Sequence, residues 1–579
     1  MERTGSRPPA FAALPVGWLR RRIEGLSGVG LALGTLFFAA SLTPSLIPRT
    51  ALTQGALAGA CFGVGYLIGV FSRWLWIYLE LPAPSPRLRL VTNYIIGIFC
   101  LSIALLFLWQ VADWQNSIRT LMDMEPLTSG HPVTVSLYAL ATFIVLLVIG
   151  RVFALAVSRF ARWTHRYVPR RVANVVGAAL AIVLFWLLAN DVLLRSAFYM
   201  ADSSFREFDA LIEPERPQPT DPAKTGSPAS LVAWNLLGRA GREFIASGAT
   251  AADISAVSGK QALEPIRVYV GLAAAETAEE RAALALEELR RVGGFEREAL
   301  VVVTPTGTGW IDPAALDAVE YLYRGDIASV ALQYSYLSSP LSLLVQPEYG
   351  REAARAIFST VYDYWRTLPK DARPKLYLHG LSLGAMNSER SLELFEIIGD
   401  PINGALWSGP PFESRMWRQI TDGRNPGSPA WLPEFRDGGF ARFMNQNGPN
   451  VAVDAPWGPT RIVYLQYASD AVTFFDYRDL YRQPAWMAEP RGPDVSPELR
   501  WYPLVTMLQL AVDMAVAAST PIGHGHVYAP QHYVDAWLAV TGISGWTPDQ
   551  LALLKAHLAE RAGMNESADD EAEQSSRGG

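Results

Sequence analysis

Five stretches without any Asp, Glu, Lys or Arg lie in the first third of the chain, and each is long enough to cross a membrane. They run over 25–48, 50–72, 90–112, 131–150 and 172–190. A helix needs about 20 apolar residues to span the hydrocarbon core of a bilayer. Buried helices of a large soluble core are the alternative, but such cores seldom contain charge-free runs of this length. We therefore predict an α-helical transmembrane bundle of five spans within residues 25–200, preceded by a cytoplasmic N-terminus over 1–24.

Arginines flank these runs unevenly. They gather at the N-terminus (Arg20, Arg21 and Arg22) and in the loops that follow the second and fourth predicted spans. Basic residues near the ends of spans stay on the cytoplasmic side. An N-terminus inside and an odd number of spans place everything after Asn190 outside. The sequence thus predicts a multi-pass protein of the cell (inner) membrane, with the lipid bilayer as a partner and an extracytoplasmic C-terminal domain.

Charge and cysteine content exclude several other classes of protein. The formal net charge is -6, and no long basic run is present that would follow a phosphate backbone, so nucleic acid is not an expected partner. The two cysteines, Cys61 and Cys100, both lie within predicted spans. Neither a disulfide framework nor a cysteine metal site is therefore expected.

The remaining sequence alternates short β-branched runs with helical patterns. Residues 201–230 are read as a linker, because they end in a stretch rich in Pro and Ser without apolar periodicity. Strands are expected at 267–271, 300–304, 327–333, 375–378, 404–407 and 461–467, with helices at 278–291, 313–323, 350–368 and 388–398. This alternation predicts a mostly parallel sheet with helices on both faces, within a domain spanning 231–564.

Two segments depart from the alternation. Residues 409–459 are rich in Gly, Pro, Trp, Arg and Asn and are too long for a plain connection. We interpret them as a cap insertion over the site, with a decoration packed elsewhere as the alternative. Residues 565–579 are polar and acidic, and we expect a disordered tail.

The pentapeptide Gly380 to Gly384 matches the pattern G-x-S-x-G around Ser382. The pattern alone is weak, but here a predicted strand precedes it and a predicted helix follows it. A nucleophile elbow needs this context, because the sharp turn exposes the serine Oγ. The amide of Leu383 then faces developing negative charge as an oxyanion donor. The alternative is a tight strand-to-helix turn in which Ser382 only caps the helix.

A serine nucleophile needs a base and an orienting acid, which follow in the order Ser, Asp, His. Asp470 comes directly after the strand expected at 461–467 and is the preferred acid, although Asp476 and Asp479 follow closely. The preferred base is His526, with His524 as the alternate, in a glycine-containing loop.

A second oxyanion donor is expected in the loop after the strand at 300–304. Its turn offers the amides of Thr306, Gly307 and Thr308, and the sequence does not choose among them. Asp312 and Pro313 look like an N-cap followed by the first residue of a helix. A capped turn without any ligand is the alternative interpretation.

Several motifs together resemble a known family. They are SLTPSLIPR (41–49), PIRVYVGL (265–272), TPTGTGWIDP (304–313), HGLSLGAMNSE (379–389) and GHGH (523–526). The chain resembles the bacterial alpha/beta-hydrolase family, which joins an N-terminal multi-helix membrane domain to a C-terminal alpha/beta-hydrolase catalytic domain. The resemblance implies a serine nucleophile in a triad of Ser382, Asp470 and either His524 or His526. One departure is that 502–519, where a final strand usually precedes the histidine, has helical spacing.

The expected function is that of a membrane-anchored serine hydrolase. Its expected reaction is cleavage of a carboxylic ester in a small lipid or envelope-associated acyl substrate, without a metal or an organic cofactor. An acyltransferase that uses the same triad is one alternative. A non-catalytic membrane scaffold or transport component with a hydrolase-like fold is the other.

Overall fold

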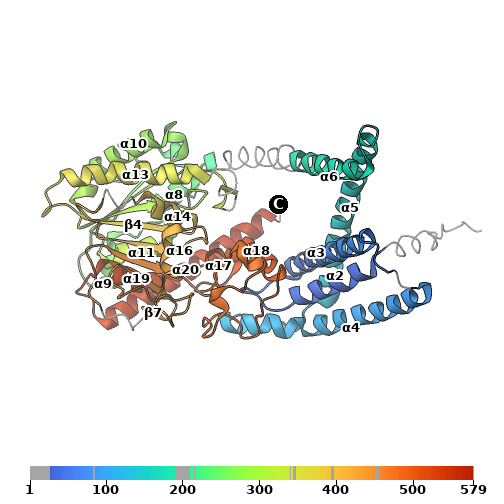
Figure 1. Ribbon diagram of the computed structural model, residues 1–579. Helices are drawn as coiled ribbons and strands as arrows, with labels where there is room; N and C mark the ends of the chain where they lie inside the picture. The colour runs from blue at the N-terminus through green and yellow to red at the C-terminus, as the bar shows by residue number, and fades with distance from the viewer. Residues whose placement is uncertain are drawn as a thin grey trace, which may run out of the picture. The chain divides into compact units, whose positions relative to one another are not determined.

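The computed structural model describes residues 26–577 except 83–84, 189–205, 207–208, 214, 340, 343–346, 393–396 and 450–454. The chain divides into two compact units, the first made of 1–44, 49–117 and 126–156, and the second of 45–48, 118–125 and 157–579. Figure 1 shows long helices in the first unit and a sheet with flanking helices in the second. The predicted cytoplasmic N-terminus and residues 201–205 of the predicted linker lie outside the described residues.

Apolar helices form the N-terminal region. They are α2 (Gly28–Ser41), α3 (Ala51–Tyr78), α4 (Pro86–Arg119), α5 (Pro132–Thr164) and α6 (Arg170–Leu187). Within the described residues, four helices are long and apolar enough to cross a membrane, namely α3 to α6. The N-terminal region is therefore helical, as predicted, with four candidate membrane spans.

The first predicted span is the exception. Helix α2 has 14 residues and ends at Ser41, shortly before Pro44 and Pro48. At 1.5 Å per residue such a helix covers about 21 Å, less than the ~30 Å of a hydrocarbon core. The prediction of five spans is not confirmed. The extracytoplasmic location predicted for the C-terminal domain depends on an odd number of spans, and that number is not confirmed either.

Glycines allow α2 and α3 to approach closely. A Cβ atom on Gly69 would lie 2.5 Å from the Cα of Gly30, and one on Gly65 would lie 2.6 Å from the carbonyl oxygen of Leu33. Small residues at such positions let two apolar helices pack backbone to backbone. The charge-free run at 25–48 thus contributes a short helix packed along α3.

The second unit contains an eight-stranded sheet of order β1-β3-β2-β4-β5-β8-β6-β7. Its strands are β1 (Ile266–Val270), β2 (Ala299–Thr304), β3 (Ile327–Leu332), β4 (Lys375–Leu381), β5 (Gly404–Ser408), β6 (Ala441–Asn445), β7 (Gly448–Pro449) and β8 (Arg461–Leu465). All neighbours pair in parallel except β6 and β7. The mostly parallel sheet predicted from the alternation is confirmed.

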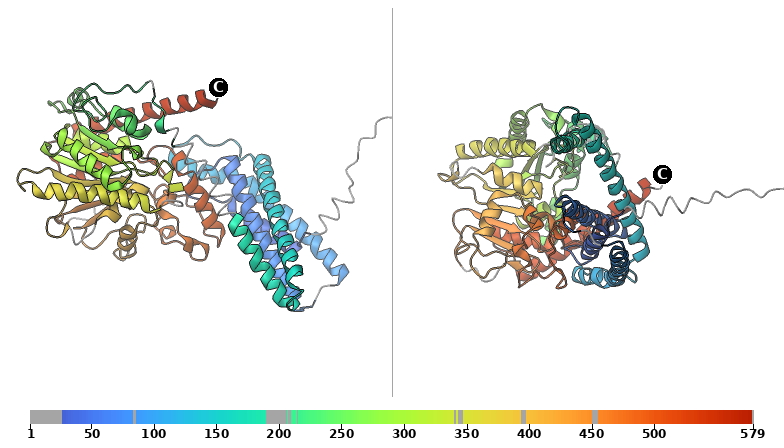
Figure 2. Two further views of the ribbon diagram at one scale, coloured as in Figure 1. Left: turned by 90° about the horizontal axis from the view of Figure 1, so that it is seen from above. Right: turned by 45° about the vertical axis from the view of Figure 1, so that its right-hand side comes forward.

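Helices cover both faces of this sheet (Figures 1 and 2). Helices α10 (Ala278–Arg291) and α13 (Pro347–Thr367) lie on one face, and α11 (Pro313–Leu322) and α19 (Pro530–Thr541) lie on the other. Central strands that are covered twice need apolar side chains in both directions. All six residues of β2 are buried, which explains its apolar run from Ala299 to Val303.

The insertion at 409–459 contributes to the sheet as well as to a surface helix. It contains α16 (Arg415–Asp422) and two strands: β6, which pairs in parallel with β8 from Ala441 to Met444, and the edge strand β7, which pairs antiparallel with β6. Within the described residues, no strand lies between β8 and His526 in the sequence. Helix α18 (Val505–Ala515) instead forms most of the segment 502–519, as its helical spacing predicts. The insertion therefore supplies both strands beyond β8, a contribution that its Gly-rich and Asn-rich sequence does not reveal.

The C-terminal helix α20 (Pro548–Arg577) continues through most of the segment for which the sequence predicts disorder. This segment contains two Ala, three Glu and one Gln, residues that favour helices even without an apolar face. The prediction of a disordered tail differs from the structure for this reason.

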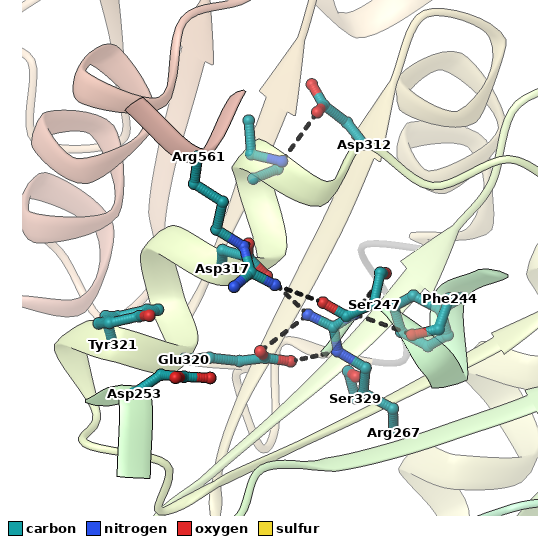
Figure 3. A network of polar contacts seen from close by, with 12 residues as sticks. Phe244, Ser247, Asp253, Arg267, Asp312, Asp317, Glu320, Tyr321, Ser329 and Arg561 are labelled. Carbon is teal, nitrogen blue, oxygen red and sulfur yellow. Dashed lines mark hydrogen bonds and ion pairs between the residues drawn. The ribbon is translucent and has the colours of Figure 1, made fainter. Parts of the chain in front are cut away.

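A buried ionic network joins β1, α11 and α20 (Figure 3). The guanidinium of Arg267 donates to Glu320 Oε1 at 2.7 Å and to Asp317 Oδ1 at 2.8 Å, and Arg561 lies 3.0 Å from Asp317 Oδ2. Burial acts to lower the pKa of Arg267, but Glu320 and Asp317 raise it overall. The network thus keeps its charges paired inside the domain and fixes α20 to the sheet.

We expect Arg267→Met to lower the free energy of unfolding by about 3–5 kcal/mol, because it leaves two buried carboxylates without their main partner. Denaturant titration of the full chain in micelles measures this loss. Arg290, which forms an exposed pair with Glu287, provides the matched control as Arg290→Met and should change stability little. A loss no larger than the control's would show that the network does not contribute to stability.

Candidate active site

Ser382 lies at a sharp turn between β4 and α14 (Leu383–Ser391). Its backbone has φ 57° and ψ -126°, a strained conformation for a residue with a side chain. Glycines on both sides permit the turn: a Cβ on Gly380 would lie 2.4 Å from the carbonyl carbon of Gly384, and one on Gly384 would lie 2.2 Å from Thr304 O. The strand, turn and helix have the arrangement that a nucleophile elbow requires.

The end of β5 connects this turn to the histidine loop. The amide of Ser382 donates to the carbonyl of Ser408 at 2.9 Å. The next residue, Gly409, has φ 49°, and a Cβ there would lie 2.6 Å from His526 Cε1 and 3.0 Å from Asp470 Oδ2. The fold therefore brings Ser382, Asp470 and His526 together around the carboxyl end of β5. At position 409 only glycine leaves room for the imidazole.

Asp470 is fully buried at the turn after β8. Its Oδ2 accepts hydrogen bonds from His526 Nδ1 at 2.7 Å and from the hydroxyl of Tyr528 at 2.8 Å. Its Oδ1 accepts from the amide of Val472 at 2.9 Å, and the Thr473 hydroxyl lies 3.2 Å from Oδ2. These contacts fix the carboxylate in the position that orients an imidazole.

His526 is bound to Asp470 through one ring nitrogen only. In a neutral imidazole whose Nδ1–H donates a hydrogen bond to the carboxylate, Nε2 carries the lone pair. Within the described residues, Nε2 is buried and has no hydrogen-bond partner. A general base needs such an atom, and contacts to the nucleophile often tighten only when substrate binds.

His524 has different surroundings. Its carbonyl accepts from the Thr520 hydroxyl at 2.8 Å, and the following amide, that of Gly525, donates to Ser469 Oγ at 2.8 Å. Ser469 in turn donates to Asp494 at 2.5 Å. His524 thus belongs to the frame of the loop, and the Asp470 carboxylate pairs with His526.

The other acids near Asp470 also have separate contacts. Asp476 pairs with Arg478, and Asp479 accepts from the amide of Asp476 at 3.1 Å. Both act as caps of a short helix over Tyr477–Leu480.

The loop after β2 lies against the elbow, since Gly384 contacts Thr304 and Pro305. Two of its three candidate amides are engaged: Thr306 N donates to Trp310 O at 2.9 Å, and Gly307 N donates to Ser339 Oγ at 3.1 Å. The amide of Thr308 has no assigned partner in the described part of the chain. Among the three candidate amides, that of Thr308 is the one left without an assigned partner within the described residues, and its part as an oxyanion donor stays a prediction.

Residues 266–554 match the model of an alpha/beta-hydrolase family, and residues 42–249 match the model of that family's N-terminus. The chain belongs to this alpha/beta-hydrolase family. Comparisons with curated proteins and with solved structures give no match.

In this alpha/beta-hydrolase, several residues near the site were not singled out by the sequence analysis. Tyr528 and Thr473 donate to Asp470, and Gly409 makes room for His526. A signal existed for Gly409, which follows the predicted strand at 404–407 by two positions. No sequence signal pointed to Tyr528 and Thr473, because their role depends on where the loop after β8 meets the loop that contains His526.

Asp312 combines two properties in this alpha/beta-hydrolase. It is the N-cap of α11 and accepts from Ala314 N at 3.0 Å, as the sequence predicts. Burial raises its pKa to about 6, although the bond from Ala314 acts to lower it. The folded chain therefore holds this proton more tightly than the unfolded chain, so stability falls as the pH rises from about 4 through 6.

We expect Asp312→Asn to raise the free energy of unfolding by about 1–3 kcal/mol above pH 7, because asparagine retains the cap without a buried charge. The gain should shrink as the pH falls below 6 and vanish near 4, where aspartate is neutral in the folded state. Denaturant titrations at several pH values measure it. A gain that does not vary with pH would contradict the raised pKa.

Proposed function

We propose that this alpha/beta-hydrolase is a membrane-anchored serine hydrolase that cleaves carboxylic esters through an acyl-enzyme. The observation that supports this most is the hydrogen bond of 2.7 Å between His526 Nδ1 and Asp470, which leaves Nε2 buried and without a partner within the described residues. The His526 ring lies beside Gly409, at the end of β5, where the carbonyl of Ser408 accepts from the amide of Ser382. The four apolar helices support membrane anchoring. An anchored site acts next to lipid or envelope-associated acyl esters.

In the proposed reaction, His526 Nε2 takes the proton of Ser382 Oγ, and the oxygen attacks the carbonyl carbon of the ester. The amides of Leu383 and Thr308 stabilise the resulting oxyanion. As the intermediate collapses, the ester C–O bond breaks and the leaving alkoxide takes the proton from His526. Water then attacks the acyl-enzyme by the same steps, releases the carboxylic acid and restores the serine.

The experiment is hydrolysis of 4-nitrophenyl esters of graded acyl length by the full chain in neutral detergent. We expect equal amounts of 4-nitrophenol and free carboxylic acid, and loss of both after treatment with an alkyl fluorophosphonate. Formation of an acylated product when an alcohol is added, in place of free acid, would favour the acyltransferase. Absence of turnover with every ester and acceptor would contradict the proposal.

A further inference from the structure

Helix α18 has its polar and apolar faces reversed relative to an ordinary surface helix. A surface helix of a globular domain turns its apolar stripe inward and its polar residues outward. In α18 the polar side chains all lie on the buried face, namely Thr506, Gln509 and Asp513. The opposite side, called here the outer face, is half-buried or exposed and consists of apolar residues: Met507, Leu508, Ala511, Val512, Met514 and Ala515.

The buried polar residues make hydrogen bonds that fix the orientation of the helix. Thr506 Oγ1 accepts from the amide of Tyr502 at 2.8 Å, and Asp513 Oδ2 accepts from the amide of Leu46 at 3.0 Å. The helix also packs against α17 (Ala471–Phe474), which begins directly after Asp470 (Figure 1). These contacts determine which face of α18 is turned inward, so its apolar residues must point outward.

Only part of the outer face is packed against the apolar core of the second unit. Met507, Ala511 and Met514 lie partly against that core, whereas Leu508 and Val512 are not among the described side chains that do so. Leu508 and Val512 are four positions apart and therefore neighbours on the helix surface. They form the part of α18 that is most available to an apolar environment outside the domain.

Residues 45–48 connect α18 to the membrane region along the chain. They belong to the second unit, and Leu46 and Ile47 are fully buried in its apolar core. Helix α3, a candidate membrane span, begins at Ala51, five residues after Leu46. Because an extended chain covers at most ~3.6 Å per residue, Leu46 lies within about 18 Å of the first residue of that span. The partner of Asp513 is thus tied closely to the end of a span.

A second connection leads from the membrane region to the same core. Residues 118–125 also belong to the second unit, and Ile118 and Met122 are buried in the core that contains Leu46. The candidate span Arg87–Met122, which contains most of α4, ends at this segment. The ends of a span lie at the surface of the bilayer. Both connections therefore indicate that the part of the second unit next to Leu46 lies at a membrane surface.

We propose that the outer face of α18 inserts into the surface of the lipid bilayer, where the headgroups meet the acyl chains. Its apolar side chains then leave water, whereas the polar residues of the helix stay inside the domain. A helix that buries one apolar face to this depth binds the membrane without spanning it. This inference rests on the membrane anchoring in the proposed function and does not depend on ester hydrolysis.

The residues that follow α18 hold the proposed catalytic base. A short 3-10 helix, Ala517–Ser519, comes directly after α18, and the amide of His526 donates to the carbonyl of Ala517 at 3.4 Å. The Thr520 hydroxyl donates to the carbonyl of His524 at 2.8 Å. Insertion of α18 therefore brings the loop of the proposed base close to the bilayer surface.

The test attaches a fluorescent label to the outer face of α18 in the full chain, reconstituted in phosphatidylcholine vesicles. The variants L508C and V512C each carry one cysteine in a C61A/C100A background. We expect lipids with brominated acyl chains to remove most of the fluorescence of both labels. The matched control is L553C, at an exposed leucine of α20, which should keep its fluorescence. Labels on α18 that are quenched no more than the label at L553C would overturn the proposal.

A label at an exposed residue of the candidate span α4, in the variant I98C, separates this inference from the anchoring. Quenching at I98C without quenching at L508C or V512C overturns the insertion of α18 alone. Absence of quenching at I98C overturns the anchoring and the insertion together. A cysteine at position 508 that is unquenched yet shielded from a membrane-impermeant maleimide would show that protein covers the outer face, and would also overturn the proposal. If one α18 variant fails to fold, the other decides.

Discussion

Replacement of His526 by alanine is expected to lower kcat for ester hydrolysis on the order of 10⁶-fold, whereas replacement of His524 should leave it within roughly tenfold. The two rings are two positions apart, but only His526 has its Nδ1 bound to Asp470 and its Nε2 unpaired in a buried position. Without that base, the serine hydroxyl keeps its proton and remains a poor nucleophile.

The comparison uses kcat and KM of the two variants with one 4-nitrophenyl ester at a fixed pH. The His524 variant serves as the control for loop structure, because its backbone and that of Gly525 make hydrogen bonds to Thr520 and Ser469. A large loss in the His524 variant with activity retained in the His526 variant would reverse the assignment of the base.

Replacement of Asp470 by asparagine is expected to lower kcat on the order of 10⁴-fold with little change in structure. The amide has the same shape, but its NH₂ group cannot accept a hydrogen bond from His526 Nδ1–H, so the imidazole adopts the wrong tautomer. The side chain also loses the negative charge that stabilises the imidazolium during attack. KM should change far less than kcat, since no contact with substrate is removed.

The matched control is Asp476→Asn. Asp476 is close in sequence but pairs with Arg478 on the surface of a short helix, so its replacement should leave kcat nearly unchanged. Equal losses in the two aspartate variants would show that Asp470 has no special role in orienting the base.

The fold was largely accessible from the sequence, because central parallel strands must be apolar on both faces. The six expected strands correspond to β1, β2, β3, β4, β5 and β8. Strand β6 was missed, because its pairing with β8 depends on a partner rather than on its own composition. The first apolar run is not confirmed as a span, since freedom from charge does not show that the helix stops at Ser41, before Pro44.

The candidate site was accessible in part for a similar reason. Motif and chain order led to Ser382, Asp470 and a histidine, whereas the choice between His524 and His526 depended on the path of a glycine-containing loop. The choice among Thr306, Gly307 and Thr308 likewise depended on partners such as Ser339, which lies 32 positions further along the chain. Local patterns identify candidates, and long-range contacts distinguish between them.

The most direct measurement is mass-spectrometric mapping of the adduct that an alkyl fluorophosphonate forms with the full chain in membranes. We expect a single phosphonylated residue, Ser382, and no labelling of the Ser382→Ala variant. Modification of a different serine, or labelling that persists in the variant, would contradict the assignment of Ser382 as the nucleophile.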